Sequence, residues 1–143
     1  MAVFASAGTT TLITAALATG RRVLGSKHPV VAAFLSSLAK LRLAQARYPD
    51  AESHLREALS LGGEAPNGDW DPCESQSLLG LSLMQQSKFV EAEPLLLYGY
   101  RGLLQRKAIP QTEKAGERII QLYTSWGKPD KVAEWRHNLQ PEK

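Results

Sequence analysis

The sequence predicts an all-α protein built from stacked pairs of helices, and two observations carry this prediction. The first is an internal repeat, because "RYPDAESHLREAL", which begins at residue 47, recurs 41 positions later as "KFVEAEPLLLYGY". The second is the spacing of Tyr48, Ala51 and Leu55, which are three and four positions apart and therefore share one face of a helix. A self-similarity of about forty residues is typical of helical repeats that stack on one another.

Composition agrees with a small helical domain. The chain has 143 residues, with 43% hydrophobic and 22% charged residues, which is ordinary for a globular protein with its own core. Aromatic residues make up only 7% of the chain, whereas Leu and Ala are abundant. This balance favours helices over strands.

The charge is small overall but unevenly distributed. The net charge is +3, yet residues 1–49 contain no Asp or Glu, so all 14 acidic residues lie from Asp50 onward. This basic end is either a solvated surface or one that attracts an acidic partner. Nucleic-acid binding is not expected, because no aromatic residues alternate with the basic ones. The basic residues before Asp50 are Arg21, Arg22, Lys27, Lys40, Arg42 and Arg47.

The first 25 residues are interpreted as a helix of the array, the remnant or cap of a preceding repeat. The segment before Arg21 is apolar, but it is short and rich in Ala, Gly and Thr for a membrane-spanning helix. A signal peptide carries positive charge before its apolar run, whereas these arginines follow it. A cleaved leader remains the alternative. Cys73 is the only cysteine, which excludes an intrachain disulfide and fits a cytoplasmic protein.

Residues 26–62 are predicted to form the first complete unit. Pro29 suits the first turn of a helix that runs to about Ala46, because its missing N–H would have no partner there. A second helix runs from Tyr48 to Leu61, where two glycines end it. The next stretch, "GGEAPNGDWDP", is predicted to be a loop.

Residues 70–108 are predicted to form the second unit. Asp71 caps its first helix, with Pro72 at the first helical position and Glu74 at the third, which is a capping-box arrangement. Its second helix runs from Phe89 to about Lys107 with Pro94 inside. Leu79, Gly80 and Leu83 supply the buried stripe of the first helix.

Residues 111–140 are predicted to form the third unit. Pro110 is expected to break the chain before a helix over residues 112–126. After the turn "WGKPD", the last helix presents Val132, Trp135 and Leu139 on its apolar side and ends before Pro141.

These residues resemble the tetratricopeptide repeat. Because the period of 41 and then 40 positions exceeds the usual 34, the chain is similar to the long-repeat variety found in kinesin light chains. The segment "RRVLGSKHPVVA" is similar to the linker between such repeats, and the C-terminal half resembles the last repeats of bacterial multi-domain serine/threonine kinase proteins. The matching residues are Leu38, Ala39, Ala51, Leu55 and Ala58, then Leu79, Gly80, Leu83, Phe89, Ala92 and Leu96, then, more loosely, Ile119, Ile120, Tyr123, Gly127 and Val132.

The resemblance implies a right-handed superhelical array, an α-solenoid, whose concave side is lined by the first helix of each pair. Its middle would be apolar at Leu78, Leu81 and Met84, with Lys40 and Arg118 beside it to hold an acidic side chain or a terminal carboxylate. In the alternative interpretation, Leu81 and Met84 pack under the next repeat. The predicted groove residues are Ser37, Lys40, Ser77, Leu78, Leu81, Met84, Gln85, Lys114, Arg118 and Gln121.

Catalysis is not expected, and neither is a cofactor or a metal. His28, His54 and His137 fall in different units, where His28 is a candidate helix cap and the other two lie on exposed helix faces. Cys73 lies in a first helical turn without a base placed beside it. The chain contains none of the phosphate-loop, zinc-protease or nucleophile-elbow motifs.

The sequence therefore predicts a scaffold that binds a peptide or helix of another protein in its concave groove. The alternative is a truncated, self-associating regulatory tail of a bacterial signalling protein, and a homodimer through the N-terminal helix belongs to that alternative. Neither nucleic acid nor a membrane is an expected partner. The fold does not name the partner, because repeats of one fold serve many pathways.

Overall fold

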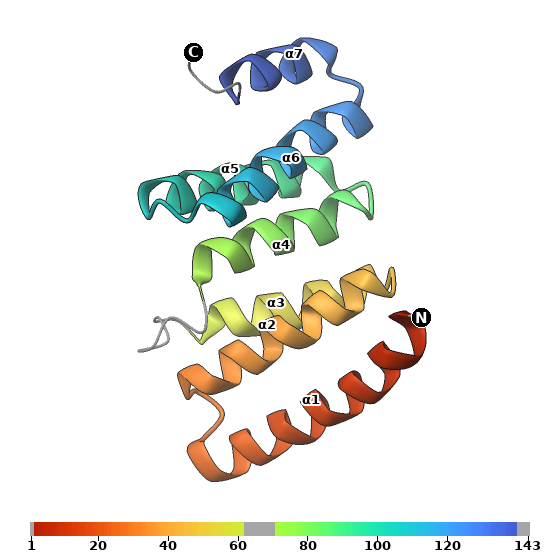
Figure 1. The fold of residues 1–143 in the computed structure, drawn as a ribbon, viewed down its shortest axis with the longest axis vertical. Coiled ribbons are helices and arrows are strands. Elements are labelled where there is room, and N and C mark those ends of the chain that lie inside the picture. Colours follow the sequence, from red (N-terminus) through yellow and green to blue (C-terminus); the bar gives the residue numbers. More distant parts are fainter. Residues whose placement is uncertain (1, 62–70, 140–143) are drawn as a thin grey trace.

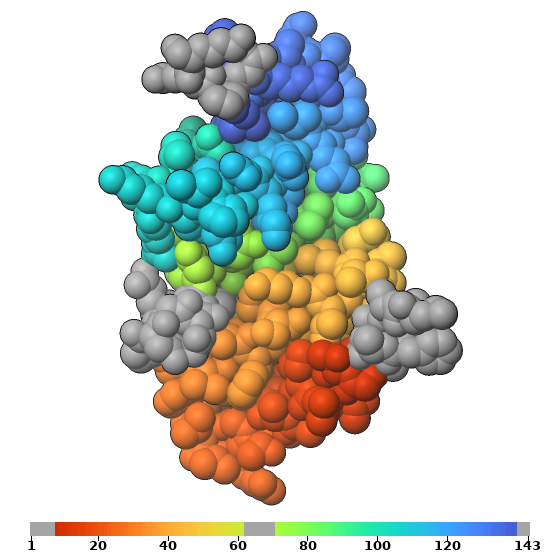
Figure 2. Space-filling view, in the orientation of Figure 1, coloured from red at the N-terminus to blue at the C-terminus, as the bar shows by residue number. Residues whose placement is uncertain are grey.

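The computed structural model describes residues 2–61 and 71–139, with side chains from Gly8 onward, and in these ranges it contains seven helices and no strand. The helices lie one above another, so that α1 and α7 form opposite ends of the stack (Figures 1 and 2). Residues 62–70 of the predicted loop and Pro141 fall outside the described residues. The helices are α1 (Ala2–Leu24), α2 (Pro29–Ala44), α3 (Tyr48–Ser60), α4 (Pro72–Met84), α5 (Phe89–Gln105), α6 (Ile109–Trp126) and α7 (Pro129–Asn138).

The predicted all-α array of three helix pairs plus an N-terminal helix is confirmed. Helix α2 pairs with α3, α4 with α5, and α6 with α7, while α1 packs against α2 (Figure 1). Each pair also contacts the next one, because α3 packs on α4 and α5 packs on α6. A stack in which each unit touches mainly its neighbours is the arrangement of repeat proteins.

The turns that join the two helices of each pair have the same backbone structure in all three pairs. Ala46, Ser87 and Gly127 all have the left-handed backbone conformation, with φ angles of 58°, 62° and 75°. They are 41 and 40 positions apart, as the repeat requires. In each turn the next N–H reaches back five residues to a helical carbonyl, which ends the first helix and fixes the angle of the second. These bonds are Arg47 N to Arg42 O at 2.8 Å, Lys88 N to Leu83 O at 2.9 Å and Lys128 N to Tyr123 O at 2.9 Å.

The helices begin where the capping residues and prolines of the sequence predict, except for α6. His28 Nδ1 accepts the backbone N–H of Val30 at 3.2 Å, and the Asp71 carboxylate accepts the N–H of Cys73 at 2.8 Å, so both residues are N-caps. The prediction that Pro110 breaks the chain is wrong, because α6 begins at Ile109. Pro110 lies in the first turn of α6, where a helix does not need the missing N–H.

The core is densest in the middle pair. Leu55, Leu83 and Leu96 are fully buried in a cluster that extends from α2 to α6. Glycine lets α4 and α5 approach closely, since a Cβ at Gly80 would lie 2.6 Å from Leu96 Cγ and one at Gly99 would lie 2.8 Å from the Cys73 carbonyl oxygen. A smaller cluster joins α1, α2 and α3.

Contacts between alternate helices define an inner and an outer side. The backbone of α4 lies beside those of both α2 and α6, whereas no two of the described helices α1, α3, α5 and α7 come that close. Side chains still connect these outer helices, as in the Arg56–Glu91 ion pair and the Tyr100–Trp135 ring contact. Helices α2, α4 and α6 therefore line the inner, more tightly spaced side of the stack.

Candidate interaction surfaces

Buried hydroxyl groups hold the three inner helices side by side. Ser36 Oγ on α2 lies 3.4 Å from Ser75 Oγ on α4, and either hydroxyl can donate. Arg118 Nη1 on α6 donates to Ser77 Oγ on α4 at 2.8 Å. Since buried polar groups need partners, these contacts fix the register of the inner helices.

Arg118 is a structural cation rather than a free one. Its Nη2 also lies 3.3 Å from Glu74 Oε1, and the exposed fractions of the two side chains are only 13% and 14%. The second oxygen of Glu74 is buried without a hydrogen-bond partner among the described residues. The prediction that Glu74 completes a capping box with Asp71 is therefore wrong, because the glutamate turns to Arg118 instead.

The apolar residues predicted for the groove are mostly part of the core. Leu78 and Met84 are 4% and 3% exposed, and Ser77 is fully buried. Leu81 is partly buried and packs against the same cluster. Eight of the 13 residues of α4 are buried, because neighbouring pairs cover this helix on both sides. This burial agrees with the alternative interpretation, in which Met84 packs under the next repeat. Leu78 and Met84 are therefore not part of the surface that a partner can reach.

The exposed part of the inner side is polar. Lys40 on α2 and Lys114 on α6 are exposed, and within the described ranges neither takes part in a hydrogen bond or an ion pair. Ser37, Gln85 and Gln121 are exposed as well. We call Ser37, Lys40, Gln85, Lys114 and Gln121 the inner face.

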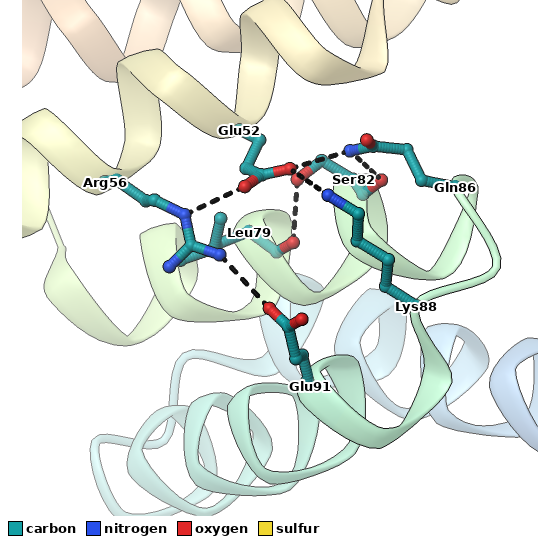
Figure 3. A network of polar contacts seen from close by, with 7 residues as sticks. All are labelled: Glu52, Arg56, Leu79, Ser82, Gln86, Lys88 and Glu91. Carbon is teal, nitrogen blue, oxygen red and sulfur yellow. Dashed lines mark hydrogen bonds and ion pairs between the residues drawn. The ribbon is translucent and has the colours of Figure 1, made fainter.

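The outer side carries a polar network that joins the first and second pairs (Figure 3). Glu52 on α3 accepts hydrogen bonds from Arg56 Nε at 2.9 Å and from Gln86 Nε2 at 2.9 Å, and Lys88 Nζ lies 3.4 Å from it. Arg56 also reaches Glu91 on α5 at 3.4 Å. Burial is the largest single influence and favours the neutral acid, but the bonds from Gln86 and Arg56 and the two positive charges together lower the pKa of Glu52. These groups satisfy one another, so the network stabilises the packing of the pairs.

A groove of about 660 Å³ lies at the C-terminal end of the stack. Within the described residues, α7 has 10 residues and α6 has 18, so the described part of α7 does not extend along the first half of α6. Two of the large apolar residues in its lining, Leu104 and Ile109, are 54% and 65% exposed. No motif in the sequence predicts this groove, and its one signal there is that Leu104 and Ile109 have no place in the repeat pattern. Its lining residues are Tyr100, Leu104, Lys107, Ile109, Thr112, Glu113, Glu117, Ile120, Asn138 and Leu139.

The described residues hold no arrangement suited to a metal ion, since no three His, Cys, Asp or Glu side chains gather among them. His54, expected on an exposed face, is instead partly buried on α3. Burial, followed by the charge of Arg42, lowers the pKa of His54. None of the described helices is long and apolar enough to span a membrane.

Comparisons with known proteins bear on the fold. No protein-family model matches the chain, and no curated protein matches it by sequence. A protein of Podosopora anserina described as a kinesin light chain with nearly identical TPR-like repeats is similar in structure, with a TM-score of 0.62, 18% identity and coverage of 96% of this chain and 70% of that one.

A point variant of that protein gives a TM-score of 0.70 at 19% identity. The match covers 93% of this chain, which spans only 64% of the length of the variant. At this identity the likeness concerns the fold alone. The observed period, the repeated left-handed turn and these neighbours agree: the chain has the TPR-like, long-repeat solenoid fold of the kinesin light chain kind.

Proposed function

We propose that the chain is a non-enzymatic scaffold whose inner face binds an acidic segment of another protein. The fold supports this proposal, because TPR-like arrays offer a row of parallel helices to an extended peptide or a helix. The observation that carries it is the pair of exposed lysines, Lys40 and Lys114, which lie on the two helices that flank α4 and have no partner within the described ranges.

The inner helices suit this role because they are held rigidly. The Ser36–Ser75 and Arg118–Ser77 contacts set α2, α4 and α6 side by side, so the two lysines keep a fixed separation. A preorganised surface loses less conformational freedom on binding. Exposed lysines attract a negatively charged segment and accelerate the encounter with it, whereas the neighbouring Ser and Gln side chains supply hydrogen bonds.

A charge-reversal experiment tests this proposal. Lys40→Glu and Lys114→Glu, combined in one bait, should lose a protein that the wild type retains from a lysate of the source cell. The matched control is Arg101→Glu combined with Lys131→Glu, which makes the same change of charge at exposed positions of the outer helices α5 and α7. The control bait should retain the partner. Equal retention by both variants would rule out binding through the inner face.

A further inference from the structure

We propose that the two ends of the stack bind each other, so that α1 of one copy occupies the C-terminal groove of the next copy. The distribution of exposed apolar side chains points to this arrangement. Among the described residues, seven large hydrophobic side chains are exposed, and five of them either lie on α1 or line the C-terminal groove. Leu12, Val23 and Leu24 are on α1, and Leu104 and Ile109 line the groove.

Helix α1 has two apolar faces, and only one of them is covered. Leu17 and Gly20 are buried toward α2. Leu12 and Val23 are 72% and 68% exposed, although they are 11 positions apart and therefore share a different face. Between them on that face lies Thr19, a small residue that allows close approach of another helix.

The groove repeats the same spacing. Ile109 and Ile120 on α6 both line it, and they are also 11 positions apart. Eleven residues span about 16 Å of helix in both cases. If α1 of one copy lies parallel to α6 of the next, Leu12 meets Ile109 and Val23 meets Ile120 at the same time. Leu104 then covers the flank of this contact from α5.

The charges on the two surfaces favour the parallel orientation of α1 and α6. Arg22 on α1 is exposed and has no described partner, and α1 contains no acidic residue. Glu113 and Glu117 are exposed in the groove, where no described cation pairs with them. In the parallel register, Arg22 lies about two residues, or roughly 3 Å along the axis, from the level of Glu117. Lys107 lies at the other end of the groove, beside the uncharged first half of α1.

This contact joins two different surfaces, so each copy in a pair still has one free α1 and one free groove. Such a heterologous contact therefore keeps adding copies. It forms a ring if the rotation between copies closes, and an open assembly if it does not. The expected product is therefore an open, head-to-tail assembly in which each copy binds the next through two different ends. It does not involve the inner face, which stays available to another protein.

The test uses two variants, each of which blocks one end. Leu12→Glu places a charge on the exposed face of α1, and Ile109→Glu places one in the groove. Both positions are exposed, and an acidic residue in the first turn of α6 is favoured by the helix dipole, so both variants should keep the circular dichroism spectrum of the wild type. In sedimentation velocity, the wild type should form species larger than a dimer as concentration rises, and each variant alone should remain a monomer.

Mixing the two variants gives the decisive result. The Ile109→Glu copy keeps an intact α1, and the Leu12→Glu copy keeps an intact groove, so an equimolar mixture should form a dimer and nothing larger. A wild type that remains monomeric at the highest attainable concentration would overturn the proposal. A mixture that stays monomeric would overturn it too. So would a dimer that Leu12→Glu abolishes and Ile109→Glu leaves intact, because α1 would then pair with α1.

A charge swap tests the register independently. Arg22→Glu and Glu117→Arg should each weaken the association by about fivefold, as expected for an exposed ion pair. The double variant carries the pair in reverse and should recover most of the wild-type affinity. Unchanged affinity in both single variants would contradict the parallel register of α1 and α6.

Discussion

Helices α5 and α7 are the second helices of consecutive pairs, yet they are packed very differently. Helix α5 has 17 residues and buries Ala92, Leu96, Gly99 and Leu103. Helix α7 has 10 residues and buries none of them. Helix α5 has α4 on one side and α6 on the other, whereas α7 packs on α6 and reaches α5 through the Trp135–Tyr100 ring contact. In a stacked repeat, burial is supplied by neighbours, so equivalent helices differ in stability according to their place in the array.

The largest expected effect comes from removing a buried side chain in the middle. Leu96→Ala should lower the free energy of unfolding by about 3–4 kcal/mol, because Leu96 is fully buried and the cavity cannot collapse between α4 and α5. Leu139→Ala, at the partly buried end of the stack, should lower it by only about 1 kcal/mol. Urea unfolding of both variants measures the difference, and equal losses would contradict the contrast between middle and end.

A matched pair of glycine substitutions sharpens this contrast. Gly99→Ala should destabilise the fold by about 2 kcal/mol, since the new Cβ would lie 2.8 Å and 2.9 Å from backbone atoms of Cys73 and Ser77. Gly116→Ala brings the Cβ to 2.9 Å from Leu139, but that atom is the end of a side chain that can shift. Because Ala also favours the helix, the change at Gly116 should be within about 0.5 kcal/mol of zero. Thermal unfolding that ranks the two variants in the opposite order would refute this account.

The turns inside the pairs should respond alike wherever they lie. Ala46→Gly and Ser87→Gly should each stabilise the fold by about 1 kcal/mol, because both residues hold the left-handed conformation that side chains disfavour. Gly127→Ala makes the reverse change in the last turn and should destabilise it by a similar amount. Chemical denaturation checks all three variants. A loss of stability at Ala46 or Ser87 would show that the turn does not have this conformation in solution.

The smallest expected effect concerns pH and the network around Glu52. The pKa of Glu52 is lowered from its ordinary 4.5, so its contribution is complete above that value and is lost as the pH falls through the lower folded pKa. Between pH 6 and pH 3 the wild type should therefore lose about 0.5 kcal/mol more than Glu52→Gln does. The effect is small because Arg56 and Lys88 are about half exposed and their charges are screened. Parallel pH profiles of the two proteins would disprove it.

Local signals in the sequence were sufficient to predict most of the fold. Helix caps, prolines and the period of the repeat act within a few residues or recur at a constant offset, so His28, Asp71 and the stripe of Ala92 and Leu96 could be assigned directly. Only the start of α6 was misplaced, because a proline is compatible both with a break and with a first helical turn.

The binding surface was harder to predict, because it depends on contacts between distant residues. Arg118 was expected to hold an acidic group of a partner, but it pairs with Glu74, which is 44 positions away. Leu78 was expected in the groove, but α4 is covered on both sides and most of its residues are buried. The C-terminal groove depends on the length of α7 relative to α6, a comparison that no single motif contains.

Hydrogen exchange of the wild type at low and high protein concentration tests the central contrast most directly. At low concentration, amides of α4 and α5 should exchange only through global unfolding, whereas those of α1 and α7 should exchange through local opening. At high concentration, α1 and the first half of α6 should become protected, because each copy covers the end of another. Uniform protection of all seven described helices at low concentration would contradict the account, since it would show that the ends are as well packed as the middle.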